Sequence, residues 1–183
     1  MALKYSSMLD LGTIMTDFDL PNVLDDAMFS SAVLNMNRPS ILMVICNHCP
    51  YVIHYHEEFQ RLERDFGSQL DIVAISSNDV SSYPQDGPKA MKELFNTLGL
   101  SFPYLFDETQ EVAKALKAEC TPEFYIYNNS NALVYRGRLD DSSPGKPIEI
   151  TGKDLRAALN DLLDGKEISS EQQPSVGCSI KWK

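Results

Sequence analysis

The chain has no apolar run long enough to cross a bilayer, and basic residues are few. Its 183 residues include 16 Lys and Arg against 26 Asp and Glu, a formal net charge of −10 at pH 7. Nucleic acids and anionic membrane surfaces bind clustered Lys and Arg, so we expect neither as a partner. The first ten residues lack an apolar stretch of signal-peptide length. We therefore expect a soluble protein of the cytoplasm.

Cysteines are also scarce, with Cys46, Cys49, Cys120 and Cys178 the four present. Four are too few for a disulfide scaffold in a chain of this length, and in a reducing compartment a disulfide is transient or catalytic. A structural zinc site usually combines two Cys-x-x-Cys or Cys-x-x-His pairs, whereas this chain has one. We expect no metal and no cofactor, and a non-enzymatic metal-binding module is the alternative from another class.

The one pair, Cys46-Asn47-His48-Cys49, lies where a strand is expected to meet a helix. The apolar run 41–45 predicts a buried strand, and the spacing of apolar residues over 51–66 predicts an amphipathic helix. A helix N-terminus favours thiolate over thiol, and His48 can donate to that thiolate. Two cysteines three residues apart on a first turn can also form a disulfide. The pattern predicts a redox-active pair.

The rest of the chain indicates one domain over residues 1–168, followed by a tail, 169–183, that docks on it. The predicted elements are an N-terminal hairpin with strands in 15–23 and 24–28, a strand at 70–76, a helix at 89–98, an extended stretch at 102–106, a helix at 109–118, a hairpin of 124–127 with 132–136, and a helix at 153–163. Strand, helix and strand at this spacing predict parallel strands.

Two loops carry further signals. The segment 76–88 is rich in Ser, Asn, Asp, Pro and Gly, and we expect it at the same sheet edge as the cysteine pair. Thr151, followed three residues later by Asp154, resembles a capping box for the last helix.

Four short motifs resemble those of a known family: Cys-Asn-His-Cys-Pro-Tyr-Val at 46–52, Cys-Thr-Pro-Glu-Phe at 120–124, Tyr-Arg-Gly-Arg-Leu-Asp-Asp at 135–141, and the ending Gly-Cys-Ser-Ile-Lys-Trp-Lys. Over about residues 11–163 the chain resembles the redoxin branch of the thioredoxin fold, the alkyl hydroperoxide reductase and thiol-specific antioxidant superfamily with the related thiol–disulfide oxidoreductases. The resemblance implies an α/β fold with a central mixed β-sheet flanked by helices, an N-terminal β-hairpin and an inserted helix.

The resemblance also implies roles for site residues. Thr121-Pro122 corresponds to the family's cis-proline loop, which faces the pair and offers backbone groups to a substrate chain. Cys46 is expected to attack a substrate disulfide and Cys49 to resolve the mixed disulfide, while His48, Glu123 or water moves the proton. The substrates would be disulfide-containing proteins or small thiols, with a thioredoxin- or glutathione-type reductant. The sequence does not indicate the oligomeric state.

A second reading of the same motif is a thiol peroxidase. Peroxiredoxins carry Thr-x-x-Cys-Pro, and residues 46–50 match it with Cys46 in place of Thr. Cys49 would then attack the peroxide, and Arg136 or Arg138 would supply the cation that this family uses. Because the Thr hydroxyl is missing, we predict disulfide exchange over peroxide reduction.

The two remaining cysteines have open roles. Cys120 precedes the Thr121-Pro122 loop and lies either on the rim of the site or in the core as a small residue. Cys178, in the docking tail, is either a third redox thiol near Cys46 or Cys49 or a cysteine with no redox task.

Overall fold

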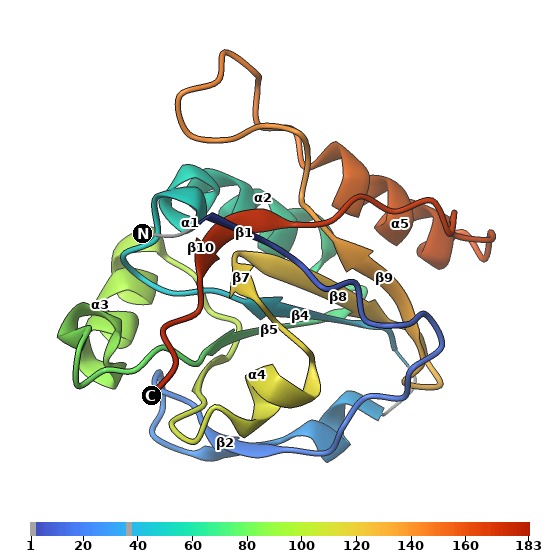
Figure 1. Ribbon diagram of the computed structural model, residues 1–183. Helices are drawn as coiled ribbons and strands as arrows, with labels where there is room; N and C mark the ends of the chain where they lie inside the picture. Colours follow the sequence, from blue (N-terminus) through green and yellow to red (C-terminus); the bar gives the residue numbers. More distant parts are fainter. Residues whose placement is uncertain (1–2, 36–37) are drawn as a thin grey trace.

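A five-stranded mixed sheet forms the centre of the computed structural model, which describes residues 3–35 and 38–183 (Figure 1). Its strand order is β6 (Tyr104–Phe106), β5 (Asp71–Ser76), β4 (Ser40–Val44), β8 (Glu123–Tyr127) and β9 (Leu133–Gly137). Strand β4 pairs parallel with β5 and antiparallel with β8, and β9 closes the sheet antiparallel to β8. The predicted α/β architecture with a central mixed sheet is confirmed.

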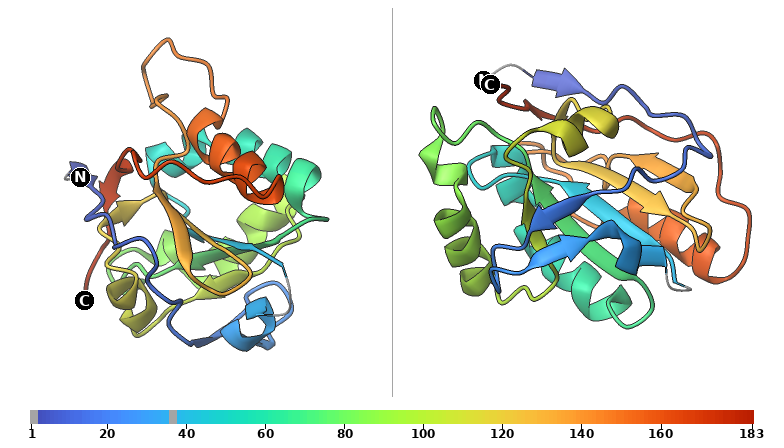
Figure 2. Two further views of the ribbon diagram at one scale, coloured as in Figure 1. Left: turned by 90° about the vertical axis from the view of Figure 1, so that its right-hand side faces the viewer. Right: turned by 90° about the horizontal axis from the view of Figure 1, so that it is seen from below.

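Helices and a hairpin cover the two faces of this sheet (Figures 1 and 2). One face carries α1 (Pro50–His54), α2 (His56–Phe66), α3 (Pro88–Leu98) and α5 (Lys153–Leu163), and the other carries α4 (Glu111–Ala115) and the hairpin of β2 (Asp19–Pro21) and β3 (Met28–Ser30). Two short 3-10 helices, η1 (Ser31–Asn35) and η2 (Pro84–Asp86), lie in the connections. Within the described part of the chain, no helix is both long and apolar enough to span a membrane.

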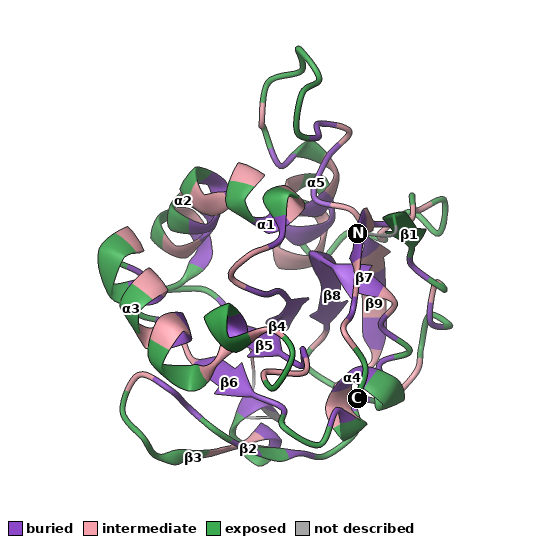
Figure 3. Cartoon of the chain, turned by 60° about the vertical axis from the view of Figure 1, so that its left-hand side comes forward, coloured by how far each residue is buried: buried purple, intermediate pink, exposed green. Residues whose placement is uncertain are grey.

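Strand β4 shows why the sequence forms a sheet that is covered on both sides. Ile41 and Met43 pack into the core under α2 and α5, whereas Leu42 and Val44 pack into the core beneath the N-terminal segment and α4. A strand buried on both faces has an unbroken apolar run, which is the pattern of residues 41–45. Figure 3 shows the central strands as buried and the outer turns of the helices as exposed.

Several predicted helix boundaries need correction. The segment 51–66 is two helices, because Tyr55 (φ −100°, ψ 5°) leaves the helical conformation between α1 and α2. Helix α4 is shorter than the predicted 109–118, because Gln110 and Lys117 on either side of it adopt left-handed backbone (φ 65° and 51°). In contrast, α3 ends at Gly99, whose left-handed φ of 67° is the predicted C-cap.

Two other local predictions are wrong. The N-terminal hairpin turns over residues 22–27, and its second strand begins only at Met28. The capping box at the start of α5 is absent: the N-cap is Gly152, and no side chain caps the helix. Instead the buried carboxylate of Asp140 accepts the backbone N–H groups of Thr151 and Gly152, at 2.9 and 2.8 Å.

The tail runs back across the domain and ends in a small second sheet. Strand β10 (Val176–Ser179) lies between β1 (Leu3–Tyr5) and β7 (Cys120–Thr121) and pairs antiparallel with both. Strands β1 and β10, from opposite ends of the described chain, therefore lie side by side (Figure 1). Because β7 leads directly into β8, the tail covers the end of a central strand.

Candidate active site

Cys46 and Cys49 lie between the end of β4 and the start of α1. Cys46 is in the connecting loop, Cys49 is the N-cap residue of α1, and Pro50 occupies the first turn as predicted. Both cysteines are buried, with 1% and 0% of their surface exposed. The N-terminus of the helix, which favours a thiolate, is therefore at Cys49 rather than at Cys46.

The loop that connects β7 to β8 faces the pair, and its Thr121–Pro122 peptide bond is cis. The Cys46 Sγ lies 3.4 Å from the Thr121 hydroxyl, and the Cys49 Sγ lies 3.1 Å from the Thr121 carbonyl oxygen. Thr121 therefore touches both cysteines. The hollow that Pro122 lines measures only about 10 Å³, so the loop and its surroundings pack without an open cleft.

Cys178 of β10 adds a third thiol to the pair. Its Sγ lies 2.7 Å from the Cys49 Sγ, and the register of β10 on β7 places Cys178 opposite Thr121. Only 5% of Cys178 is exposed. Cys46, Cys49 and Cys178 thus form a thiol cluster around Thr121, with Cys49 in contact with the tail.

Contacts within the thiol cluster determine which sulfur carries negative charge. Cys49 accepts hydrogen bonds from the thiols of Cys178 and Cys46 and, more weakly, from the Thr121 side chain and the Val52 N–H, and together they lower its pKa to about 2 against the opposing effect of burial. The Thr121 carbonyl also opposes the charge, because a carbonyl oxygen can only accept. The donors outweigh these effects, so the lowered pKa favours Cys49 as the thiolate of the reduced cluster.

The pKa values of the two cysteines that contact Cys49 are shifted upward. The pKa of Cys46 is raised by its hydrogen bond to Cys49, by burial and by the negative charge of Asp86. The pKa of Cys178 is also raised, chiefly by its hydrogen bond to Cys49 and by burial, while Lys181 favours its charged form. Cys46 and Cys178 are therefore protonated donors around one thiolate.

His48 is held by a carboxylate that the sequence analysis did not identify. Its Nδ1 lies 2.6 Å from Oδ2 of Asp86, and its ring stacks on Tyr83 with centroids 5.3 Å apart. Asp86 is fully buried and also accepts the backbone N–H groups of Asn47 and His48, at 2.9 and 3.2 Å, and the side-chain amide of Asn78, at 2.8 Å. Asp86 therefore fixes both the His48 ring and the loop that carries the cysteines.

The segment 76–88 was expected at this edge of the sheet, and it does supply Asp86. Its polar composition indicated a loop near the pair but could not distinguish Asp86, which is buried, from Asp79, whose backbone N–H donates to Lys181 in the tail. That choice depends on the turn of η2, which carries Asp86 under the loop of the pair.

One grouping among the described residues has the spacing of a metal site. Ligand atoms of Cys46, His48 and Asp86 lie within 4.8 Å of one another. Asp86 already accepts four hydrogen bonds from its neighbours, so a metal could bind only if several of them broke. Orientation of His48 accounts for the same contacts without a metal.

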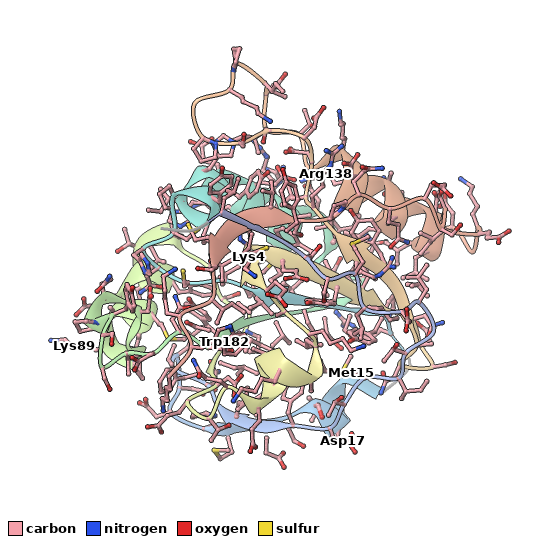
Figure 4. The ribbon with its side chains drawn as sticks, in the orientation of Figure 1. Lys4, Met15, Asp17, Lys89, Arg138 and Trp182 are labelled. Atoms are coloured by element: carbon pink, nitrogen blue, oxygen red, sulfur yellow. The ribbon has the colours of Figure 1, made fainter. Side chains whose placement is uncertain are left out.

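The two arginines proposed as a peroxidase cation bind elsewhere. Arg136 donates to Oε1 of Gln172 at 3.1 Å. Arg138 lies beside α5 (Figure 4), with its Nε 2.6 Å from Oδ2 of Asp154. Neither is among the hydrogen-bond partners that the structure shows for the thiol cluster, so neither supplies a cation there.

Cys120, next to Thr121 on β7, lies outside the thiol cluster. It is fully buried, and its Sγ faces Oε2 of Glu123 at 3.8 Å. Burial, followed by the nearby charge of Glu123, raises the pKa of Cys120. Burial also raises the pKa of Glu123 to about 7. The structure thus places Cys120 as a core residue rather than on the rim of the site.

A hollow of about 840 Å³ lies elsewhere, between the N-terminal segment and α4. Thr16, Phe18, Phe106 and Val112 are among the residues that line it, and none of its lining residues is a cysteine. The candidate site is therefore a covered group of thiols rather than an open pocket.

A mixed sheet with a dithiol at the β4–α1 junction and a facing cis-proline loop defines a redox protein of the thioredoxin fold. Residues 11–136 match the AhpC/TSA family, and the chain belongs to it. This thioredoxin-like redoxin family supports activity of the thiol–disulfide oxidoreductase or peroxidase type. The search of curated proteins gave no match.

Solved structures are similar over nearly the whole chain. An uncharacterized conserved protein from Geobacillus kaustophilus is 47% identical with a TM-score of 0.97, over 100% of this chain and 97% of that one. A hypothetical protein from Sinorhizobium meliloti 1021 is 38% identical with a TM-score of 0.94, over 98% of each chain. A thiol-disulfide oxidoreductase from Bacteroides fragilis, 18% identical with a TM-score of 0.60 over 82% of this chain and 99% of that one, shares the fold.

Proposed function

We propose that this protein is a thiol–disulfide oxidoreductase whose Cys46 and Cys49 cycle between dithiol and disulfide. The observation that carries the proposal is the contact of both sulfurs with Thr121, at 3.4 and 3.1 Å, directly before the cis-proline. In the thioredoxin-like proteins that the chain resembles, a substrate chain pairs with the backbone at this position. The scarcity of cysteines supports action in a reducing compartment, and we propose the cytoplasm.

The lowered pKa of Cys49, beside a raised pKa of Cys46, supports Cys49 as the attacking sulfur, which reverses the order expected from the sequence. The Cys49 thiolate attacks one sulfur of a substrate disulfide, and the other substrate sulfur leaves as a thiolate. The Cys46 thiol then loses its proton to that thiolate and attacks Cys49. The bond between Cys49 and the substrate breaks, the reduced substrate leaves, and the enzyme holds a Cys46–Cys49 disulfide.

Return to the dithiol requires two electrons from a thioredoxin- or glutathione-type thiol, which attacks the Cys46–Cys49 disulfide in the same manner. His48 takes part as a positioned group rather than a free one, because Asp86 holds its Nδ1 at 2.6 Å. Thr121 contacts both reacting sulfurs and so fixes the distance over which the disulfide forms.

A thiol peroxidase is the second candidate, and one observation favours it. Cys46 donates a hydrogen bond to Cys49, as the Thr of Thr-x-x-Cys-Pro would in that family. The contacts of Arg136 and Arg138 with Gln172 and Asp154 leave Cys49 without an arginine. Disulfide exchange requires no such cation, and we therefore rank it first.

The test compares the two substrates directly. We expect the protein to accelerate reduction of insulin disulfides by dithiothreitol, and we expect peptide mass mapping after stoichiometric oxidised glutathione to show a Cys46–Cys49 link. The Cys49→Ser variant should lose insulin reduction. Consumption of hydroperoxide faster than insulin reduction, with a sulfenic acid at Cys49, would overturn the assignment in favour of the peroxidase. A stoichiometric metal ion on protein purified without added metal would instead support the metal-binding alternative.

A further inference from the structure

The proposed exchange needs only Cys46 and Cys49, yet the tail places a third thiol in contact with the Cys49 sulfur. The Cys49 and Cys178 sulfurs are 2.7 Å apart, and a disulfide bond is about 2.0 Å long. We propose that Cys178 is a third redox thiol of this site and forms a reversible disulfide with Cys49. This inference rests on the proposed function, because the exchange supplies the oxidised Cys46–Cys49 pair from which the new disulfide forms.

The tail is bound on both sides of Cys178, so the contact belongs to a built structure rather than to a loose end. Before it, Ser175 N–H donates to the Ser6 hydroxyl at 3.0 Å. After it, Ile180 N–H donates to the Glu119 carbonyl at 3.1 Å, and Lys181 N–H donates to Asn78 Oδ1 at 2.8 Å. These bonds hold Cys178 opposite Thr121 in the register of β10 on β7.

Gly177 lets β10 come close enough for the sulfurs to meet. A Cβ at this position would lie 2.0 Å from the Thr121 carbonyl oxygen, in a direct clash with backbone. Any larger residue would push β10 away from β7 and carry Cys178 with it. Gly177 and Cys178 thus act together, one by allowing the approach and the other by supplying the thiol.

The exchange between the two disulfides conserves atoms and electrons. When Cys46 and Cys49 are joined, Cys49 no longer accepts a hydrogen bond from Cys178, and the charge of Lys181 favours the Cys178 thiolate. This thiolate attacks the Cys49 Sγ, a Cys49–Cys178 bond forms, and the Cys46–Cys49 bond breaks. Cys46 leaves as a thiolate and takes up the proton that Cys178 released. The protein stays oxidised by two electrons throughout.

The new disulfide would also change access to the site. Strand β10 occupies the edge of β7 that a substrate chain needs for pairing at Thr121. A Cys49–Cys178 bond fixes the tail on that edge, whereas reduced Cys178 leaves the tail held by hydrogen bonds alone. The oxidised protein therefore has one form, with Cys46–Cys49 joined, in which hydrogen bonds alone hold the tail on β7, and a second form, with Cys49–Cys178 joined, in which a covalent bond fixes it there.

The experiment uses oxidised glutathione as the probe on full-length Cys46→Ser protein. Glutathione should first join Cys49, and Cys178 should then displace it, so that mass mapping shows a Cys49–Cys178 link and little glutathione on the protein. In the Cys46→Ser, Cys178→Ser double variant, glutathione should stay on Cys49. Because the displacing thiol is held in place, we expect release from the single variant at least roughly tenfold faster than from the double variant.

Two control variants distinguish the effect of the Cys178 thiol itself from the effect of its position beside Cys49. Cys46→Ser with Gly177→Val keeps Cys178 but displaces β10, and should retain glutathione on Cys49 as the double variant does. Cys46→Ser with Cys120→Ser should still form the Cys49–Cys178 link, because Cys120 faces Glu123. If Cys46→Ser does not fold, partial oxidation of the wild-type chain replaces it, and both the Cys46–Cys49 and the Cys49–Cys178 links should appear.

Stable glutathione on Cys49 with Cys178 open to alkylation would overturn the inference. The Cys178→Ser variant shows which proposal has failed. If this variant forms the Cys46–Cys49 link and no variant forms a Cys49–Cys178 link, the proposed function is supported and the redox role of Cys178 is rejected. If neither link forms, both the proposed function and the redox role of Cys178 are rejected.

Discussion

Strand β7 separates two cysteine environments. Both are buried, but they differ in their hydrogen bonds and in the direction in which the cysteine pKa is shifted. Cys120 and Thr121 are successive residues of a strand, so their side chains point to opposite sides. On the Thr121 side lies the thiol cluster, in which Cys49 accepts hydrogen bonds and its pKa falls to about 2. On the other side Cys120 faces the Glu123 carboxyl, and its pKa rises. Burial alone suppresses a thiolate, and neighbouring donors create one.

The largest expected effect comes from removing each of these cysteines in turn. Cys49→Ser should lower the rate of insulin reduction by more than roughly 1000-fold, because it removes the attacking sulfur. Cys120→Ser should retain activity, because Cys120 does not touch the thiol cluster. Turbidity of reduced insulin in the presence of dithiothreitol measures both rates. Equal losses of activity in the two variants would contradict the proposed difference between the environments of Cys49 and Cys120.

Alkylation of the native, reduced protein tests the same contrast without substitution. Since the thiolate is the reactive form, Cys49 should react with iodoacetamide at neutral pH at least roughly 100-fold faster than Cys120. Mass mapping of the labelled peptides over time gives the two rates. Cys120 should match Cys49 only in denaturant, and similar rates in the native protein would contradict the assignment of the charge.

Glu123 provides a test of the Cys120 side through stability. Its pKa rises from 4.5 to about 7 on folding, so the folded state holds a proton that the unfolded state releases between these values. The stability due to Glu123 is therefore complete below about pH 4.5, falls as the pH rises to about 7, and is constant above. At about 1.4 kcal/mol per pH unit, the fall is about 3 kcal/mol.

The Glu123→Gln variant lacks this titration. The difference in free energy of unfolding between variant and wild type should therefore change in favour of the variant by about 3 kcal/mol from pH 4.5 to pH 7. Urea unfolding at each pH measures it, and the constant effect of replacing a carboxyl by an amide cancels in the difference. A flat difference would show that Glu123 titrates normally.

Asp86 is the counterpart of Glu123 on the side of the cysteine pair, and it differs by its hydrogen bonds. Asp86 accepts four, from Asn47, His48 and Asn78, whereas Glu123 accepts backbone bonds at 3.0 and 3.4 Å. Asp86→Asn should therefore destabilise the protein, by about 2 kcal/mol.

A second readout separates the charge of Asp86 from its structural role. Because that charge raises the pKa of Cys46, Asp86→Asn should lower it, and alkylation of Cys46 in a Cys49→Ser background should begin at lower pH. Unfolding in urea gives the change in stability. Loss of stability with no shift in Cys46 reactivity would limit Asp86 to holding the loop.

The parts of the fold that the sequence predicted are those that depend on local pattern. The apolar run of β4 arises from burial of both faces of the strand, and the spacing of Leu155, Ala158 and Leu159 in α5 arises from burial of one face of the helix. Both elements form close to where they were expected. The break at Tyr55 was not predictable in this way. Its hydroxyl bonds the Asp140 carboxylate and the Ser142 carbonyl, which come from a distant loop.

The same distinction, between features set by local pattern and features set by distant packing, applies to the candidate site. The Cys46–Cys49 pair and the cis bond at Thr121-Pro122 were expected from short motifs, and the structure brings them together. Asp86 was not specified by any motif, and the position of Cys178 near the pair was only one of two open alternatives, because each depends on how a distant segment packs. For Cys178, docking of the tail was expected, but its register on β7 is set by backbone pairing and by Gly177.

The close approach of β10 to β7 at Gly177 limits which peptide sequences could bind β7 in place of the tail. A peptide that replaces β10 on β7 in the same register meets the Thr121 carbonyl with the residue that precedes its cysteine. Only glycine fits there, so chains with a bulkier residue before the cysteine would have to bind in a shifted register or hold their backbone farther from Thr121. Peptide libraries that vary this single position would then be enriched for Gly-Cys, and the tail would serve as their template.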